Sequence, residues 1–230
     1  MKDAQKFLRV SLAGNEFLLV EGKVSKKALQ ERVLSLSERI DGVLLTLPLS
    51  EEKVRMIYYD VNRKTGEIKR ERMCGNGLIA TGTYYLKKLE RGGIFVKTDA
   101  GTRLCVRENG RVWAEIRNVK RRGDIISVEG VRHFILKNFE VQSLEACRQA
   151  LSLMRKEKNA CASTLFRGRL VTYETGVEDI TGACGTACVA YTYQKGVKKC
   201  VLTTRSGRKI NVRWSDDLKH VFISGGVGGI

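Results

Sequence analysis

The sequence predicts an α/β (α+β) fold of two similar domains, and two observations carry that prediction. Short alternating or apolar runs typical of strands are interleaved with longer stretches in which apolar residues recur at helical spacing. A segment of the first half also recurs in the second, because residues 98–107 align with residues 204–213 and share threonine, glycine, valine and arginine. Since each copy follows a Cys-Gly segment that opens a helix, we interpret the repeat as an internal duplication. Two duplicated α/β halves predict domains related by a pseudo-two-fold axis, with a cleft between them.

The first half contains two expected helices among several expected strands. Ser25 is a candidate N-cap for a helix that runs to about Ile40, with leucine and valine at helical spacing. The second helix begins at the first Cys-Gly segment and ends near Leu89, before Gly92-Gly93. The expected strands are residues 7–12, 16–20, 43–47, 54–60, 94–98, 103–107 and 112–116.

The second half repeats this order in reduced form. One helix is expected over residues 143–156, and another from the second Cys-Gly segment to about Gly196. The expected strands are residues 131–136, 163–166, 170–174, 199–204, 209–214 and 221–224. We place the N-terminal domain at residues 1–118 and the C-terminal domain at 119–222, and expect residues from about 223 to 230 to return to the first.

Composition narrows the class of protein. A hydrophobic content of 43% argues against disorder, and the apolar runs are too short to cross a membrane. The first residues lack the apolar core of a signal peptide, so we expect a cytoplasmic protein with mostly reduced cysteines. The formal charge of +17 is spread along the chain, its tightest cluster being Lys120-Arg121-Arg122. A charge of this size would suit a nucleic-acid partner, but the basic residues are scattered and no recognised nucleic-acid-binding motif accompanies them. We therefore favour a solvated basic surface that attracts anionic substrates.

Two Cys-Gly segments carry the chemistry, Met73-Cys74-Gly75-Asn76-Gly77 and Ala183-Cys184-Gly185-Thr186-Ala187. A thiol at a helix start lies beside unpaired N–H groups and the positive end of the helix dipole, which favour the thiolate. The N–H groups of Gly75, Asn76, Gly185 and Thr186 could hold a carboxylate. Two such thiols facing one substrate suit removal of a proton from one face of a carbon and its return to the other, with one thiolate and one thiol at the start.

Other roles for the cysteines are weighed against this one. Cys184 and Cys188 are four residues apart and could ligate a metal, but the chain has only two histidines, His133 and His220, and no Cys-x-x-Cys pair. A disulfide between Cys74 and Cys184 could form in air. The remaining thiols are expected in the core: Cys105, Cys147, Cys161, Cys188 and Cys200.

With these motifs the chain resembles the diaminopimelate epimerase family, within the cofactor-independent group that includes proline racemase. The two cysteine segments together are specific to that family, and weaker matches follow in the same order along nearly the whole chain. Those matches are Gly14-Asn15-Glu16-Phe17, Asp41-Gly42, Gly130-Val131-Arg132-His133 and Tyr173-Glu174-Thr175-Gly176.

The resemblance implies a cofactor-independent racemase or epimerase with Cys74 and Cys184 as its two bases, and with neither pyridoxal phosphate nor a metal. It also implies two domains, each a mixed or antiparallel sheet around a central helix, and a homodimer that acts on a small amino acid substrate. Asn15 would shape the cleft, and Glu174 with Asn159 would contact the far end of the substrate. His133 matches a histidine near the bases, but it could equally be a hydrogen-bonded structural residue.

The departures from the family concentrate at the part of the site that would hold the distal group of diaminopimelate. Thr175 stands where the family has arginine, and Val131 and Asp60 stand where it has asparagines. A distal carboxylate would lose its charge-assisted pair there, whereas Asp60 and Glu174 would suit a cationic or neutral group such as that of lysine, ornithine or histidine.

Three hypotheses therefore remain open. The first is an amino acid racemase or epimerase with a substrate other than diaminopimelate. The second is a diaminopimelate epimerase of lysine biosynthesis in which Arg132 holds the distal carboxylate. The third is a basic nucleic-acid-binding protein on a retained epimerase scaffold, which would give no reason for the paired thiols.

Overall fold

The computed structural model describes residues 6–62, 65–136, 143–154, 160–174 and 179–229. The chain forms two compact units, unit 1 from residues 1–114 with 227–230, and unit 2 from residues 115–226. The sequence places this boundary a few residues later, after residue 118, and the return to the first domain a few residues earlier, at about residue 223. Within the described residues, no helix is long and apolar enough to span a membrane.

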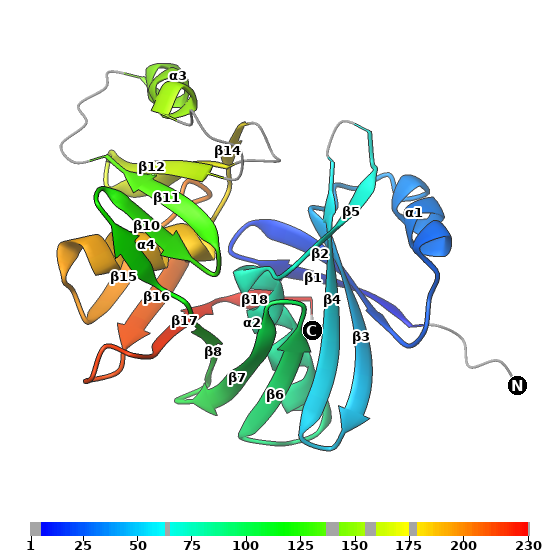
Figure 1. Cartoon of the computed structure of the whole chain (residues 1–230). Coiled ribbons are helices and arrows are strands. Elements are labelled where there is room, and N and C mark those ends of the chain that lie inside the picture. The colour runs from blue at the N-terminus through cyan, green and yellow to red at the C-terminus, as the bar shows by residue number, and fades with distance from the viewer. Residues whose placement is uncertain (1–5, 63–64, 137–142, 155–159, 175–178, 230) are drawn as a thin grey trace, which may run out of the picture. The chain divides into compact units, whose positions relative to one another are not determined.

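Unit 1 is a mixed sheet that curves around one helix (Figure 1). The sheet has the order β8-β7-β6-β4-β3-β2-β1-β18, with β5 paired to β4, and its parallel pairs are β2 with β3 and β4 with β6. The helices are α1 (Lys26–Leu34) and α2 (Gly75–Lys88), and α2 contacts β1, β2, β3, β4, β6, β7 and β18. The strands are β1 (Phe7–Leu12), β2 (Asn15–Glu21), β3 (Gly42–Ser50), β4 (Lys53–Val61), β5 (Ile68–Glu71), β6 (Gly93–Thr98), β7 (Gly101–Glu108), β8 (Arg111–Ile116) and β18 (Val227–Gly228).

Helix α1 is shorter than the sequence predicts. Ser25 caps it as expected, because its hydroxyl accepts the N–H of Ala28 at 3.1 Å. The helix nevertheless ends at Leu34 and not near Ile40, with Ser35 at the C-cap. Ile40 is still buried against α1, β2, β3 and β4. The apolar spacing therefore correctly indicated that Ile40 is buried, although the helix ends before this residue.

Unit 2 contains a six-stranded sheet, of order β14-β13-β12-β11-β10-β9, and an antiparallel trio, β15-β16-β17. Among the described strand pairs of the six-stranded sheet, β11 and β12 pair in parallel and the others are antiparallel. The helices α3 (Leu144–Met154) and α4 (Gly185–Lys195) lie on opposite faces of this sheet (Figure 1). The strands are β9 (Lys120–Arg122), β10 (Ile125–Val128), β11 (Val131–Ile135), β12 (Ala160–Phe166), β13 (Arg169–Glu174), β14 (Asp179–Thr181), β15 (Lys199–Thr203), β16 (Lys209–Trp214) and β17 (Val221–Gly225).

The two faces of the six-stranded sheet differ in polarity because side chains alternate along each strand. Ala162, Tyr173 and Ile180 lie in one register row and pack with Cys147 and Leu151 of α3. The alternating positions carry polar groups on the other face, including a Ser163–Thr172 hydroxyl pair at 2.9 Å. Helix α4 contacts β10 and β11 of this sheet together with β15, β16 and β17.

The predicted fold class is confirmed, since each unit places strands around a helix that begins at a Cys-Gly segment. The expected helix starts and all of the expected strands are present, with bounds shifted by a few residues. The sequence missed five short strands: β5, β9, β10, β14 and β18.

Candidate functional site

Cys74 is the N-cap of α2, the position that the sequence predicts for it. Its backbone is extended, with φ −129°, and the helix begins at the next residue, Gly75. The Cys74 sulfur is half-buried and accepts the N–H of Gly77 at 3.4 Å. An N–H group directed at the sulfur, together with the helix dipole, stabilises negative charge there.

The residues after Cys74 allow close packing at the start of α2. A Cβ on Gly77 would lie 2.6 Å from Cδ2 of Leu44 in β3 and 3.3 Å from Cβ of Cys74. Leu44 is fully buried, so this glycine lets the helix start lie directly on the sheet. Asn76 is also buried, at 3% exposure, and belongs with Gly75 to the first turn.

Cys184 occupies the equivalent N-cap of α4, also with an extended backbone, φ −128°. Its sulfur lies 3.3 Å from the hydroxyl oxygen of Thr186, and the residue is only 8% exposed. Burial raises the pKa of the Cys184 thiol well above its usual value, as do the nearby Glu174 and Cys161, against the opposing hydrogen bond from Thr186. This direction is opposite to the lowered thiol pKa expected at a helix start, because desolvation outweighs the hydrogen bonds that Thr186 and the Ala187 backbone give to the sulfur.

Glu174 and His133 approach this part of unit 2 from the six-stranded sheet. Glu174 ends β13, where it pairs with Asp179 of β14. His133 lies in β11, in register with Cys161 of β12, and is fully buried. Burial lowers the pKa of His133 to about 3, so the ring is neutral at pH 7. Among the described residues neither ring nitrogen has a hydrogen-bond partner, which differs from the expectation of a hydrogen-bonded structural histidine.

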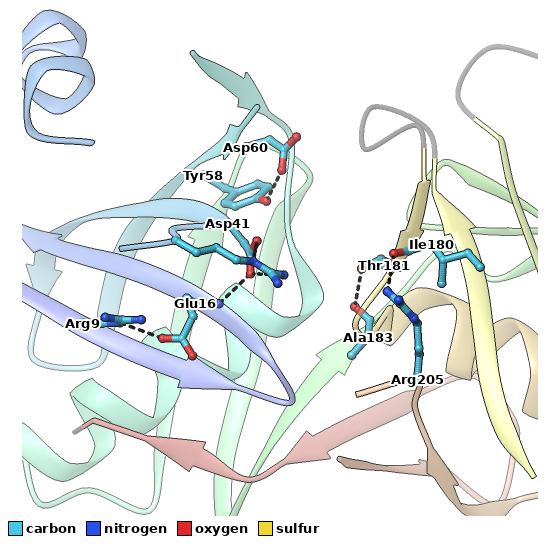
Figure 2. A network of polar contacts seen from close by, with 10 residues as sticks. Arg9, Glu16, Asp41, Tyr58, Asp60, Ile180, Thr181, Ala183 and Arg205 are labelled. Carbon is cyan, nitrogen blue, oxygen red and sulfur yellow. Dashed lines mark hydrogen bonds and ion pairs between the residues drawn. The ribbon is translucent and has the colours of Figure 1, made fainter. Parts of the chain in front are cut away.

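In unit 1, a network of charged groups holds the turn before Asn15 (Figure 2). Asn15 is the first residue of β2 and is buried. The next N–H, that of Glu16, donates to the Asp41 carboxylate at 3.0 Å, while the Glu16 carboxylate accepts Arg9 Nε at 3.0 Å. Arg39 donates to both Asp41 oxygens, at 2.9 and 3.1 Å. These contacts fix the start of β2.

Asp60 lies on β4 and accepts the Tyr58 hydroxyl at 2.9 Å (Figure 2). Tyr58 packs closely on Gly42, where an added Cβ would lie 2.5 Å from the ring. Sequence reasoning missed Tyr58, although its spacing of two residues from Asp60 in an expected strand places both on one face. Cys161 was also missed as a neighbour of Cys184, because that relation depends on tertiary packing.

The structure thus gathers the candidate residues into two sets, each within one unit. Asn159 and Thr175 lie outside the described residues. The set of unit 1 is Asn15, Asp60, Cys74, Gly75 and Asn76, and the set of unit 2 is His133, Glu174, Cys184, Gly185 and Thr186.

Comparison with known proteins identifies relatives over nearly the whole chain, although no family model matches it. The chain is 26% identical to the diaminopimelate epimerase of Aquifex aeolicus, over 96% of this chain and 94% of that protein. The resemblance to the diaminopimelate epimerase family is confirmed. These relatives also confirm the prediction of an isomerase of the racemase or epimerase type.

Solved structures support the fold. A phenazine biosynthesis protein of the PhzF family from Enterococcus faecalis matches with a TM-score of 0.65 at 10% identity, over 97% of this chain and 95% of that one. A hydroxyproline epimerase from Agrobacterium vitis, solved with bound trans-4-hydroxy-L-proline, matches with a TM-score of 0.62 at 14% identity, over 98% of this chain and 89% of that one.

Proposed function

We propose that this chain is a cofactor-independent amino acid racemase or epimerase that inverts the Cα centre with two cysteines, Cys74 and Cys184. The observation that carries the proposal is the equivalent placement of these two cysteines. Each is the extended N-cap of a helix that begins with glycine, in two units of similar construction. Similarity to an enzyme named diaminopimelate epimerase adds independent support.

In the proposed reaction one thiolate removes the α-proton and the opposite thiol returns a proton to the other face of Cα. The C–H bond breaks toward the first sulfur, the electron pair remains on the substrate, and the new C–H bond forms from the second S–H. The N–H groups of Gly75, Asn76, Gly185 and Thr186 would bind the substrate carboxylate. They would thereby stabilise the negative charge that develops beside Cα.

The environments of the two sulfurs support different starting states. Cys184 is buried beside Glu174, and its raised pKa favours the thiol. Cys74 is half-buried, and the Gly77 N–H points at its sulfur. We therefore assign Cys74 as the base and Cys184 as the acid in the resting enzyme. Each turnover exchanges the two protonation states, so the reverse reaction uses the opposite roles.

Solvent exchange in D₂O tests this mechanism. The wild-type enzyme should incorporate deuterium at Cα of both enantiomers of its substrate and interconvert them. Cys184→Ala should exchange only the enantiomer whose proton faces Cys74, without inversion, and Cys74→Ala should exchange only the other. Full inversion by either variant would exclude the two-base mechanism, and the absence of exchange across a panel of amino acids that includes diaminopimelate would exclude the function.

The distal end of the substrate is proposed to be cationic or neutral. The Asp60 carboxylate, held by the Tyr58 hydroxyl, supplies negative charge on β4, and Glu174 supplies more at the end of β13. Lysine, ornithine and histidine carry distal groups that would suit these carboxylates.

Substrate panels distinguish this proposal from its alternative, diaminopimelate in lysine biosynthesis. Asp60→Asn should lower kcat/KM for lysine or ornithine about tenfold, the effect of losing one charge-assisted contact, with the exposed Glu67→Gln as the control. If diaminopimelate is the substrate, Arg132→Ala should instead raise KM for it alone. The cytoplasmic location, the homodimer and the absence of a nucleic-acid partner stay predictions.

A further inference from the structure

The repeated segments of the two halves build equivalent turns. Residues 98–101 join β6 to β7, and residues 204–207 precede β16 after β15. Each turn opens with a buried threonine whose hydroxyl donates to a nearby carbonyl. Thr98 donates to Gly101 at 2.8 Å, and Thr204 donates to Arg208, the residue directly after its turn, at 3.0 Å. The second residue of the first turn, Asp99, corresponds to the second residue of the other, Arg205.

In unit 2 this turn holds the strand that leads to Cys184. The Arg205 guanidinium donates to the Ile180 carbonyl at 3.2 Å, and the Ser206 N–H donates to the Gly182 carbonyl at 3.0 Å (Figure 2 shows the Arg205 contact). Ile180 belongs to β14 and precedes Cys184 by four residues. The turn therefore fixes the backbone on the N-terminal side of the reactive sulfur.

In unit 1 the corresponding turn holds the strand that leads to Cys74. The Asp99 carboxylate accepts Nε and Nη2 of Arg70, at 2.7 and 3.0 Å, and also pairs with Arg55. Arg70 belongs to β5 and precedes Cys74 by four residues, the same offset as Ile180 from Cys184. The two halves thus share the position of the contact, although one uses an ion pair and the other a bond to a backbone carbonyl.

We propose that Asp99 and Arg205 are positioning residues for Cys74 and Cys184, respectively. Three residues lie between Arg70 and Cys74, and three lie between Ile180 and Cys184. A shift of β5 or β14 would therefore be transmitted directly to the cysteine at the helix N-cap. In unit 2 the Thr181 hydroxyl donates to the Ala183 carbonyl at 3.4 Å, which ties the short connection together. The inference deepens the proposed function, but it concerns the placement of the sulfurs, which can be measured without a substrate.

The test measures the alkylation rate of each cysteine separately, with iodoacetamide and mass spectrometry, from pH 7 to pH 10 in the full-length chain. Arg205→Ala should change the Cys184 rate by about two- to tenfold, the effect expected from losing one hydrogen bond. Cys188, buried in the same helix, should change less than twofold. Arg205→Lys should retain the wild-type Cys184 rate, and Arg208→Ala, at an exposed position directly after the turn, should leave that rate unaltered.

The matching experiment in unit 1 uses Asp99→Asn, which should alter the Cys74 rate while Cys105, buried in β7, serves as the internal reference. An unchanged Cys184 rate in Arg205→Ala, or equal changes at Cys184 and Cys188, would overturn the proposal for unit 2. If Arg205→Ala does not fold, Arg205→Met compared with Arg205→Lys decides the question.

Measuring racemase activity distinguishes a failure of this inference from a failure of the proposed function on which it rests. If the chain racemises an amino acid, Arg205→Ala should lower kcat more than it changes KM. If no amino acid reacts, the proposed function fails while the alkylation rates still decide whether these residues position the sulfurs.

Discussion

Burial of His133 should make unit 2 sensitive to acid. The ring is fully buried in β11, and desolvation lowers its pKa from the usual 6.5 to about 3. When folding lowers the pKa of a histidine, stability is unaffected at pH values above the unfolded-state pKa. Stability then decreases as the pH falls from the unfolded-state pKa toward the folded-state pKa. At pH 5.0 the unfolded histidine binds a proton and the folded one does not. Because pH 5.0 lies about 1.5 units below the unfolded pKa, the free energy of unfolding is lowered by about 2 kcal/mol, at about 1.4 kcal/mol per unit.

Urea unfolding at pH 7.0 and pH 5.0, of the His133→Asn variant and of a reference protein that retains His133, measures this cost. Both proteins should carry Trp113→Phe, so that fluorescence reports Trp214 of unit 2. Between the two pH values, the free energy of unfolding of the reference protein should fall by about 2 kcal/mol more than that of His133→Asn, because contributions from other groups cancel. His220→Asn, at a half-exposed position, is the control for loss of a histidine. Equal losses in the presence and absence of His133 would refute the reasoning.

Three further predictions follow from packing and charge. Gly77→Ala should destabilise the protein by about 1–3 kcal/mol in thermal unfolding, because its Cβ would lie 2.6 Å from a leucine methyl, whereas Gly92→Ala meets nothing within 4 Å and should be nearly neutral. Asp41→Ala should cost about 1.5–3 kcal/mol in urea, since it removes the charged acceptor of a backbone N–H, and the half-exposed Arg39→Ala should cost less. Alkylation of Cys184 should reach half its maximal rate at a higher pH than in the denatured chain, since burial raises the pKa of the thiol, and an equal or lower midpoint would contradict this.

The sequence predicted the features that depend on chemistry within a few residues. Cys74 and Cys184 could be placed at helix starts because glycine follows each of them and an apolar helical pattern comes next. The Ser25 cap and the stop of α4 at Gly196, which adopts φ 65°, are equally local. Such signals act through the backbone of the residue itself or of its next turn.

Features that depend on distant partners could not be predicted in this way. Strand β9 consists only of the exposed residues Lys120, Arg121 and Arg122, and it is defined by pairing with β10 and not by an apolar pattern. The raised pKa of Cys184 depends on its depth in unit 2 and on Glu174, neither of which is visible in the Cys-Gly motif. The motif therefore identified the candidate reactive thiol but not its protonation state.

The different partners of Asp99 and Arg205 imply that the two duplicated turns can no longer be exchanged. A graft of residues 204–207 onto the first half would bring a guanidinium against Arg70 and Arg55, and would place three cations where one anion now pairs with two. The reciprocal graft would place a carboxylate against the Ile180 carbonyl. Both groups are hydrogen-bond acceptors, so no hydrogen bond could form between them. A chimera of the halves would need the strand residue to be transplanted together with its turn.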